Sequence, residues 1–312
     1  MKRHFRELSI AVALLVMLLA LAVFAPAFYQ KQPLLSLLTR EAPVLIVACG
    51  MALVIIARQI DISVGSQFSV CCVCAGLFAS LRWPLAVVLP ATVAVGALLG
   101  AFNGALIAGL GLPSIVVTLA TMVAWREGLQ WARQGIWVDL PEGVQWFGWS
   151  QAAGQILIMS VAMLLLLALA WILKHLAAGR FLYAVGSDAE AARLAGIRPR
   201  LGTFLTFILL GALTGLAATL NIAQSPQVAP NSGTGLELRT IAAVVVGGVA
   251  ISGGRGNLWG VFAGLLLLAC ISPALTHLHV EAYWEKAIQG AIILLAVVAD
   301  GWRSRNVGGS GG

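Results

Sequence analysis

Apolar runs cover almost the whole chain and are separated by short polar breaks. The longer runs approach the roughly 20 residues that an α-helix needs to cross a bilayer. This pattern predicts an all-α integral membrane protein with about ten transmembrane segments, which together form one membrane domain over residues 1–305. The runs fall at residues 8–28, 42–57, 67–81, 84–109, 113–131, 153–174, 201–223, 240–252, 257–278 and 285–301.

Two of these runs, 67–81 and 240–252, are too short to cross a bilayer comfortably, and each adjoins a polar break that contains glycine. The first break includes ISVGS from Ile62, and the second includes ISGGR from Ile251. Interrupted helices at corresponding places in two halves are typical of transporters built from repeats. We therefore predict two five-span halves, about 8–150 and 151–305, and leave open whether the short runs cross fully or re-enter.

The composition excludes an ordinary soluble domain, because 60% of the residues are apolar and only 10% are charged. The net charge of +7 does not indicate a nucleic-acid partner, since much of the basic charge lies at the chain ends and between Lys174 and Arg200. Basic loops stay in the cytoplasm, so we expect both termini and this basic segment there. The first run is predicted to be an uncleaved span rather than a signal peptide, because it is long and more spans follow. Residues 306–312 have the composition of a flexible linker.

One polar segment within the basic stretch has capping residues at both ends, which is typical of a short helix. Ser187 is placed to cap the first turn, and Glu190 completes a capping box. Asp188 lies near the positive end of the helix dipole and Arg193 lies further along. Gly196 is expected to end the helix as a C-terminal cap. The segment therefore predicts a rigid helix over 187–196 that is presented to a cytoplasmic partner.

The chain lacks the common catalytic and nucleotide-binding motifs. The dipeptide Gly-Lys never occurs, so the chain has no phosphate-binding loop of its own. Neither a nucleophile-elbow motif nor a zinc-protease motif is present. The five cysteines lie in apolar runs and favour a packing role. We therefore predict no metal site, no cofactor and no catalytic residue.

Four polar residues near the breaks are candidates for a solute pathway, since polar groups inside a membrane are costly and call for a function. They are Asp61, Ser63, Asn103 and Glu237. Asp61 is spaced to pair with Arg58, which leaves local neutralisation and a pathway role equally open. For Asn103, hydrogen bonding between packed helices is the favoured interpretation.

Other features favour anchoring and packing. The loop at 134–151 contains three tryptophans, which prefer the membrane interface, and Arg126 and Glu127 just before it favour interfacial anchoring. Small residues repeat every four positions and predict close helix packing. These ridges are Gly96, Gly100, Gly104 and Ala108; Gly256, Gly260 and Gly264; and Gly211 with Gly215.

Seven motifs are found at 60–66, 102–104, 179–186, 191–197, 235–238, 241–248 and 253–256. Together they resemble the monosaccharide-type permeases of bacterial ATP-binding-cassette (ABC) importers, a family that includes ribose, xylose, rhamnose and autoinducer-2 permeases. The stretch 230–237 and the pairs at 283–284 and 300–301 are most similar to the autoinducer-2 and rhamnose branches. Arg239 departs from the family, many members of which carry an acidic residue there.

The resemblance implies a permease subunit in the bacterial inner membrane, paired with a second copy or with a sister permease. It also implies two separate ATP-binding subunits, a periplasmic solute-binding protein and a small, neutral, sugar-like solute. Segment 179–200 then corresponds to the helix that couples the permease to the ATPase. The coupling residues implied at matching positions are Gly186, Ser187, Asp188, Glu190, Ala191, Arg193 and Gly196.

Two other classes of function are alternatives to this one. A secondary transporter driven by an ion gradient also has broken helices and repeats, and it would need Asp61 and Glu237 as an acidic relay. An integral-membrane enzyme would carry clustered catalytic groups on one face, and the sequence has no such cluster.

Overall fold

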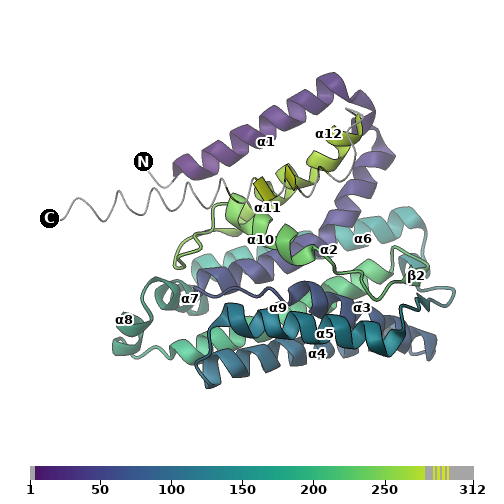
Figure 1. Cartoon of the computed structure of the whole chain (residues 1–312). Coiled ribbons are helices and arrows are strands. Elements are labelled where there is room, and N and C mark those ends of the chain that lie inside the picture. Colours follow the sequence, from purple (N-terminus) through teal and green to yellow (C-terminus); the bar gives the residue numbers. More distant parts are fainter. Residues whose placement is uncertain (1–3, 278–283, 285–286, 289, 292–293, 295–312) are drawn as a thin grey trace.

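The computed structural model describes residues 4–277, 284, 287, 288, 290, 291 and 294. Most of its long helices run along one common direction (Figure 1). One end of the bundle carries α7 (Ala177–Ser187) and α8 (Ala189–Leu194), and we call it the α8 end. The other end, the β end, carries β1 (Val138–Asp139) and β2 (Gln227–Val228), which pair antiparallel with Val138 opposite Val228.

The remaining elements are nearly all helical. Before residue 134 they are α1 (His4–Phe24), η1 (Pro26–Tyr29), α2 (Lys31–Ile56), α3 (Val64–Ser80), α4 (Leu85–Gly104), the π-helix η2 (Ala105–Gly109) and α5 (Ser114–Arg133). After it they are η3 (Gln145–Gly148), α6 (Gln151–His175), α9 (Pro199–Ile222), α10 (Leu236–Val246), α11 (Leu258–Ala269) and α12 (Ile271–His277).

Five helical stretches in the described part of the chain are long and apolar enough to cross a membrane. They are Lys31–Ile56, Leu85–Gly109, Gln151–His175, Pro199–Ile222 and Leu258–Thr276. The two runs expected to be short form α3, with 17 residues, and α10, with 11 residues. Most of the expected last crossing at 285–301 lies outside the described residues, and the whole tail at 306–312 does. The ten-span count and the two halves therefore stay predictions.

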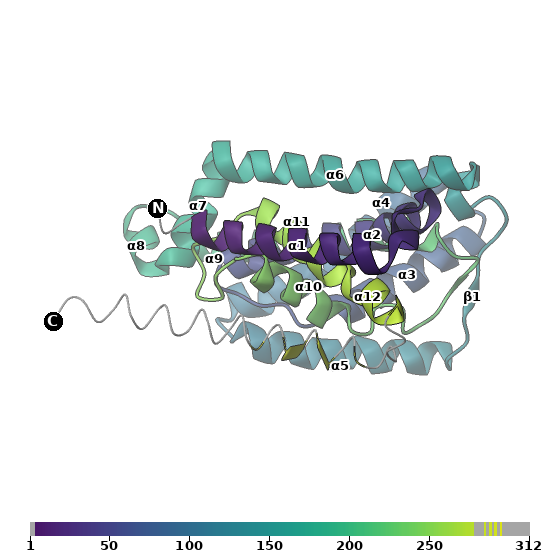
Figure 2. The ribbon, with the colours of Figure 1, turned by 90° about the horizontal axis from the view of Figure 1, so that it is seen from above.

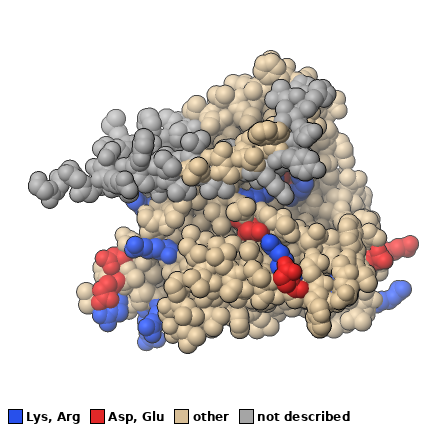
Figure 3. Space-filling model, in the orientation of Figure 1, with Lys and Arg blue, Asp and Glu red and all other residues tan. Residues whose placement is uncertain are grey.

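Helix α2 lies at the centre of the bundle. Of its most apolar 18 residues, 94% are buried, and α6, α9, α10 and α11 all pack against it. Helices α5 and α6 run along opposite edges (Figure 2). On the face seen in Figure 3, the described surface between the two ends is largely uncharged and is interrupted halfway by a small group of acidic and basic side chains. A buried α2 and an apolar outer surface are what a helical bundle embedded in lipid requires.

Glycines bring α4 and α9 into direct backbone contact. A Cβ added to Gly96 would lie 2.1 Å from the carbonyl oxygen of Gly211, and one added to Gly100 would lie 2.1 Å from that of Phe207. These contacts confirm that this ridge serves helix packing. Because α4 precedes residue 150 and α9 follows it, the ridge joins the two predicted halves.

A second glycine contact joins α10 to α11. A Cβ on Gly260 would lie 2.0 Å from the carbonyl oxygen of Gly247, and one on Gly264 would lie 2.5 Å from that of Ala243. Gly256 was grouped with this ridge, but it lies outside the helix with a φ of +148°, where it serves the turn before α11.

Candidate functional site: a polar centre and a coupling segment

The polar break before α3 is a turn. Arg58 has a φ of +63°, so the chain leaves the helical path directly after α2. The pairing of Arg58 with Asp61 at helical spacing is therefore wrong, and the described residues contain no ion pair between them. Asp61 is fully buried instead. Its Oδ1 accepts hydrogen bonds from the Ser63 backbone N–H at 2.8 Å and from the Ser63 hydroxyl at 2.6 Å.

Side chains from α3 and α4 complete this network. Gln67 Nε2 donates to Asp61 Oδ2 and to Ser63 Oγ, both at 2.9 Å, and Asn103 Nδ2 donates to Ser63 Oγ at 2.8 Å. Three of the four pathway candidates are thus in mutual contact, and all three are fully buried. Asn103 links α4 to α3, as its helix-packing interpretation predicts. Gln67 was not singled out from the sequence, although its spacing of four residues from Ser63 is a detectable signal.

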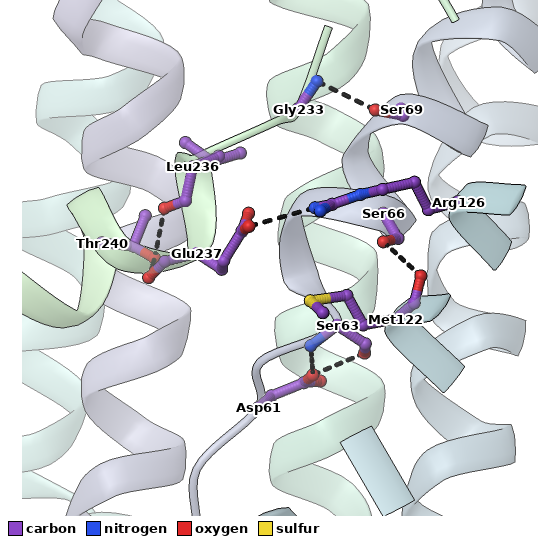
Figure 4. A network of polar contacts seen from close by, with 10 residues as sticks. All are labelled: Asp61, Ser63, Ser66, Ser69, Met122, Arg126, Gly233, Leu236, Glu237 and Thr240. Carbon is purple, nitrogen blue, oxygen red and sulfur yellow. Dashed lines mark hydrogen bonds and ion pairs between the residues drawn. The ribbon is translucent and has the colours of Figure 1, made fainter. Parts of the chain in front are cut away.

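The fourth candidate, Glu237, lies at the start of α10 and faces α5. Its Oε1 accepts from Arg126 Nη2 at 3.0 Å, and the side chains of Glu237 and Arg126 are 8% and 27% exposed (Figure 4). Arg126 therefore pairs across the bundle and does not act as the interfacial anchor that its position favoured.

Close contacts hold the first turn of α3 against the segment that leads into α10. A Cβ on Gly65 would lie 2.0 Å from Glu237 Oε2 and 2.5 Å from the carbonyl oxygen of Gly233. The Gly233 backbone N–H donates to Ser69 Oγ at 2.9 Å (Figure 4). The starts of α3 and α10 therefore meet in the interior, as expected for the interrupted helices of a transporter. We call the Asp61 network and the Glu237–Arg126 pair the polar centre.

A second ion pair is made by Arg239, two residues after Glu237 on α10, and sequence reasoning missed it. Arg239 Nη2 donates to Glu41 Oε1 at 2.6 Å, and the Glu41 side chain, on α2, is only 3% exposed. The contact with Glu41 is a structural reason for a basic residue at position 239 of this chain. A carboxylate beside an apolar run is costly to bury and needs a partner, so Glu41, directly before the run at 42–57, carried a usable signal. Its sequence neighbour Arg40 also pairs with it, at 3.5 Å.

The predicted helix over 187–196 is shorter than expected and has a different cap. Ser187 is the last residue of α7, and Asp188 adopts extended backbone and caps α8. Asp188 Oδ1 accepts from the backbone N–H groups of Glu190 and Ala191 at 2.9 and 3.0 Å. The Glu190 carboxylate binds Arg193 at 2.5 Å and does not turn back to the cap. The capping box of Ser187 with Glu190 is therefore wrong, because Ser187 is itself helical.

The C-terminal cap is confirmed. Gly196 has a φ of +82°, and its N–H donates to the Arg193 carbonyl at 3.0 Å. The Ile197 N–H donates to the Ala192 carbonyl, also at 3.0 Å. These two bonds form a Schellman motif, in which glycine adopts the left-handed conformation without strain. Pro199 then begins α9.

The coupling segment is joined to the bundle where three backbone segments meet. A Cβ on Gly186 would lie 1.7 Å from the carbonyl oxygen of Ile56 and 2.7 Å from the Gly254 nitrogen. The Gly254 N–H donates to that same Ile56 oxygen at 2.9 Å. The Tyr183 hydroxyl donates to the Gly256 carbonyl at 2.8 Å. The end of α7, the end of α2 and the α10–α11 loop therefore form one contact, which we call the Gly186 junction.

Two observations on the described residues concern metal binding and the cysteines. They contain no group of three or more His, Cys, Asp or Glu side chains that would hold a metal ion. All five cysteines are free thiols, and four of them are buried.

Comparison with known proteins gives relatives over nearly the whole chain. The chain is 34% identical over 297 residues to the autoinducer 2 import system permease protein LsrC of Enterobacter sp. (strain 638), which covers 95% of this chain and 87% of the relative. It is 35% identical to the protein of the same name from Klebsiella pneumoniae, with 95% and 86% covered. The Escherichia coli K12 protein of that name is 34% identical, with 95% and 87% covered. No solved structure matches the chain.

These relatives confirm the resemblance to bacterial permeases and to the autoinducer-2 branch in particular. Residues 34–297 match the family described as branched-chain amino acid transport system / permease component. The matched region includes α3, α8 and α10 and therefore contains both the polar centre and the coupling segment. The chain is an integral membrane permease and belongs to this family of transport-system permease components.

Proposed function

We propose that the chain is the membrane-spanning subunit of an ABC importer in the bacterial inner membrane. It carries autoinducer-2 or a related sugar-like solute, such as rhamnose or a pentose, from the periplasm to the cytoplasm. Energy comes from two separate ATP-binding subunits, and a periplasmic protein delivers the solute to a pair of permeases. The named relatives support the substrate class.

The Gly186 junction is the observation that carries this proposal. A short helix with both ends capped protrudes at the α8 end. The helix before it, α7, is joined to α2 and to the α10–α11 loop by the backbone contacts of Gly186. Displacement of α8 by a closing ATPase is therefore transmitted to both elements. The surface offered to the partner includes Asp188, Ala191 and Leu194, which is 78% exposed. In this proposal the α8 end faces the cytoplasm.

The polar centre is the proposed part of the pathway. Glu237 and Arg126 lie at the edge of α10 and α5, where a solute with several hydroxyl groups would find a donor and an acceptor. Asp61, Ser63 and Asn103 lie behind this edge and hold the first turn of α3 in place. Because the charges at the edge are paired, the site suits a neutral solute better than an ionic one.

The test separates contact with the ATPase from folding. Asp188→Lys combined with Arg193→Glu reverses the charges of α8 and removes its cap, whereas Asp188→Asn keeps a capping oxygen. We expect the double variant to insert in the membrane but to lose co-purification with the ATPase and to lose uptake. Asp188→Asn should retain both. Normal association and uptake by the double variant would refute the coupling role.

The energy source distinguishes this proposal from a secondary transporter. We expect uptake in proteoliposomes to persist after the ion gradient is collapsed and to stop when the ATPase subunit is omitted. Uptake by the chain alone, driven by an ion gradient, would overturn the proposal.

A further inference from the structure

We propose that the α8 end also holds a binding site for one anionic phospholipid. A groove of about 700 Å³ lies between α6, α7 and α9. Leu169 and Leu173 of α6 form one wall, and Leu205 and Leu209 of α9 form the other. Leu53 of the buried α2 also lines it. The groove is therefore a recess in the side of the bundle.

The apolar lining of the groove suits the acyl chain of a phospholipid. Apart from Arg198 and Thr206, the groove is lined by aliphatic side chains, glycines and Phe181. Its walls belong to α6 and α9, both of which are long and apolar enough to cross a membrane. Leu205 is 52% exposed in this wall. An apolar recess between two spans is in contact with lipid rather than with water.

The end of the groove nearest α8 carries the charge that an anionic headgroup requires. Arg198 lines the groove and is exposed. Its backbone carbonyl accepts from the Gly202 N–H at 3.2 Å, but its guanidinium makes no hydrogen bond or ion pair with any described residue. Lys174 and Arg180 are sequence neighbours of lining residues on α6 and α7 and do not line the groove themselves. Arg180 Nη1 donates to the His175 carbonyl at 3.3 Å. Basic pockets between membrane helices are typical sites for acidic lipid headgroups.

The acidic residues nearby are already engaged. Asp188 accepts two backbone hydrogen bonds as the cap of α8, and Glu190 forms an ion pair with Arg193. The positive charge of Arg198 is therefore left for a ligand. An uncharged apolar partner, such as a helix of another subunit, would fill the groove but leave this charge unpaired.

The structure also offers a variant that fills the groove without disturbing the helix. A Cβ added to Gly202 meets only Val185 Cγ2, at 3.9 Å. Gly202→Phe thus places a ring in the groove, whereas Gly202→Ala leaves most of the space open. Arg200→Gln is the matched charge control, because Arg200 lines a separate recess with Arg58 and Ser114.

The test is lipid retention by the full-length chain purified in detergent and measured by native mass spectrometry. Phosphatidylglycerol is added, with phosphatidylethanolamine and phosphatidylcholine of the same acyl chains as comparisons. We expect one phosphatidylglycerol to be retained at least about tenfold more tightly than either comparison lipid. Arg198→Gln should abolish this preference, and Gly202→Phe should remove the bound lipid. Arg200→Gln and Gly202→Ala should behave as the unmodified chain.

Three results would overturn the inference. They are equal retention of all three lipids, equal losses for Arg198→Gln and Arg200→Gln, and unchanged retention in Gly202→Phe. Dissociation of a protein partner by Gly202→Phe with lipid retention intact would assign the groove to that partner. The inference rests on the proposed function in one respect: if the α8 end faces the cytoplasm, the bound lipid belongs to the cytoplasmic leaflet. Because retention is measured without ATPase, its failure is distinguishable from a failure of ATP-driven uptake.

Discussion

Replacement of Gly186 by alanine tests how the coupling segment is joined to the bundle. The added methyl group would lie 1.7 Å from the Ile56 carbonyl oxygen and 2.8 Å from the Ile56 carbonyl carbon. Real Cβ contacts are essentially never shorter than 3.0 Å, so the two backbones must separate by about 1.3 Å along that line, from 1.7 to 3.0 Å. Both contacting atoms belong to backbone, so no side-chain rotation relieves the overlap.

The cost follows from two terms. Overpacking of a close contact destabilises a protein by about 1–3 kcal/mol. A 1.3 Å separation also strains the 2.9 Å hydrogen bond from Gly254 to the Ile56 oxygen, and loss of a typical hydrogen bond costs about 1 kcal/mol. We therefore expect Gly186→Ala to destabilise the chain by about 2–4 kcal/mol and to shift α8 relative to α2.

The assay compares thermal unfolding in detergent with ATP hydrolysis and solute uptake by the complex in proteoliposomes. We expect a lower unfolding temperature, ATP hydrolysis within about twofold of normal and a large loss of uptake, because the α8 displacement no longer reaches α2. Gly202→Ala is the control, since its Cβ has a single contact at 3.9 Å. Normal stability and uptake in Gly186→Ala would refute the mechanical role of the junction.

Three further predictions concern the polar centre and the cap. Gly65→Ala should lower stability by about 1–3 kcal/mol, seen in thermal unfolding, because its methyl group meets Glu237 Oε2 and the Gly233 oxygen. Arg126→Gln and Glu237→Gln should each destabilise the chain by about 1–3 kcal/mol. The double variant should lose less stability than the sum of the two single losses; strictly additive losses would show that the two side chains do not interact. Asp188→Ala should speed amide exchange in α8, at a cost of about 1 kcal/mol, whereas Asp188→Asn should not; equal exchange in both variants would argue against the cap.

Local features of the sequence were sufficient for much of the fold. The apolar run at 153–174 became α6 (Gln151–His175), and that at 201–223 became α9 (Pro199–Ile222). The short runs became the short helices α3 and α10. Gly196 ends α8 as expected. In each case the decisive signal lies within one helix or one turn, where hydropathy and backbone preference act directly.

Contacts between distant residues were not predictable in this way. Arg126 and Glu237 are 111 positions apart, and Arg239 and Glu41 are 198 apart, so no local spacing indicates either pair. The predicted cap of α8 is one residue too early because α7 continues through Ser187, and no local pattern marks where that helix ends. Among the pathway candidates, the contact of Ser63 with Asn103 depends on how α3 packs against α4.

The amino-acid sequence alone determined that this protein is a helical membrane protein with a short capped helix, because bilayer thickness and helix-end chemistry act on neighbouring residues. Only the tertiary structure decided that Gly186, at the end of α7, contacts the backbone of α2 and that Glu237 faces Arg126. Those contacts depend on how helices far apart in the chain pack together. A charge in an apolar segment, or a glycine in a helix, indicates in the sequence that the position needs a contact. Only the packing of the helices determines which residue makes that contact.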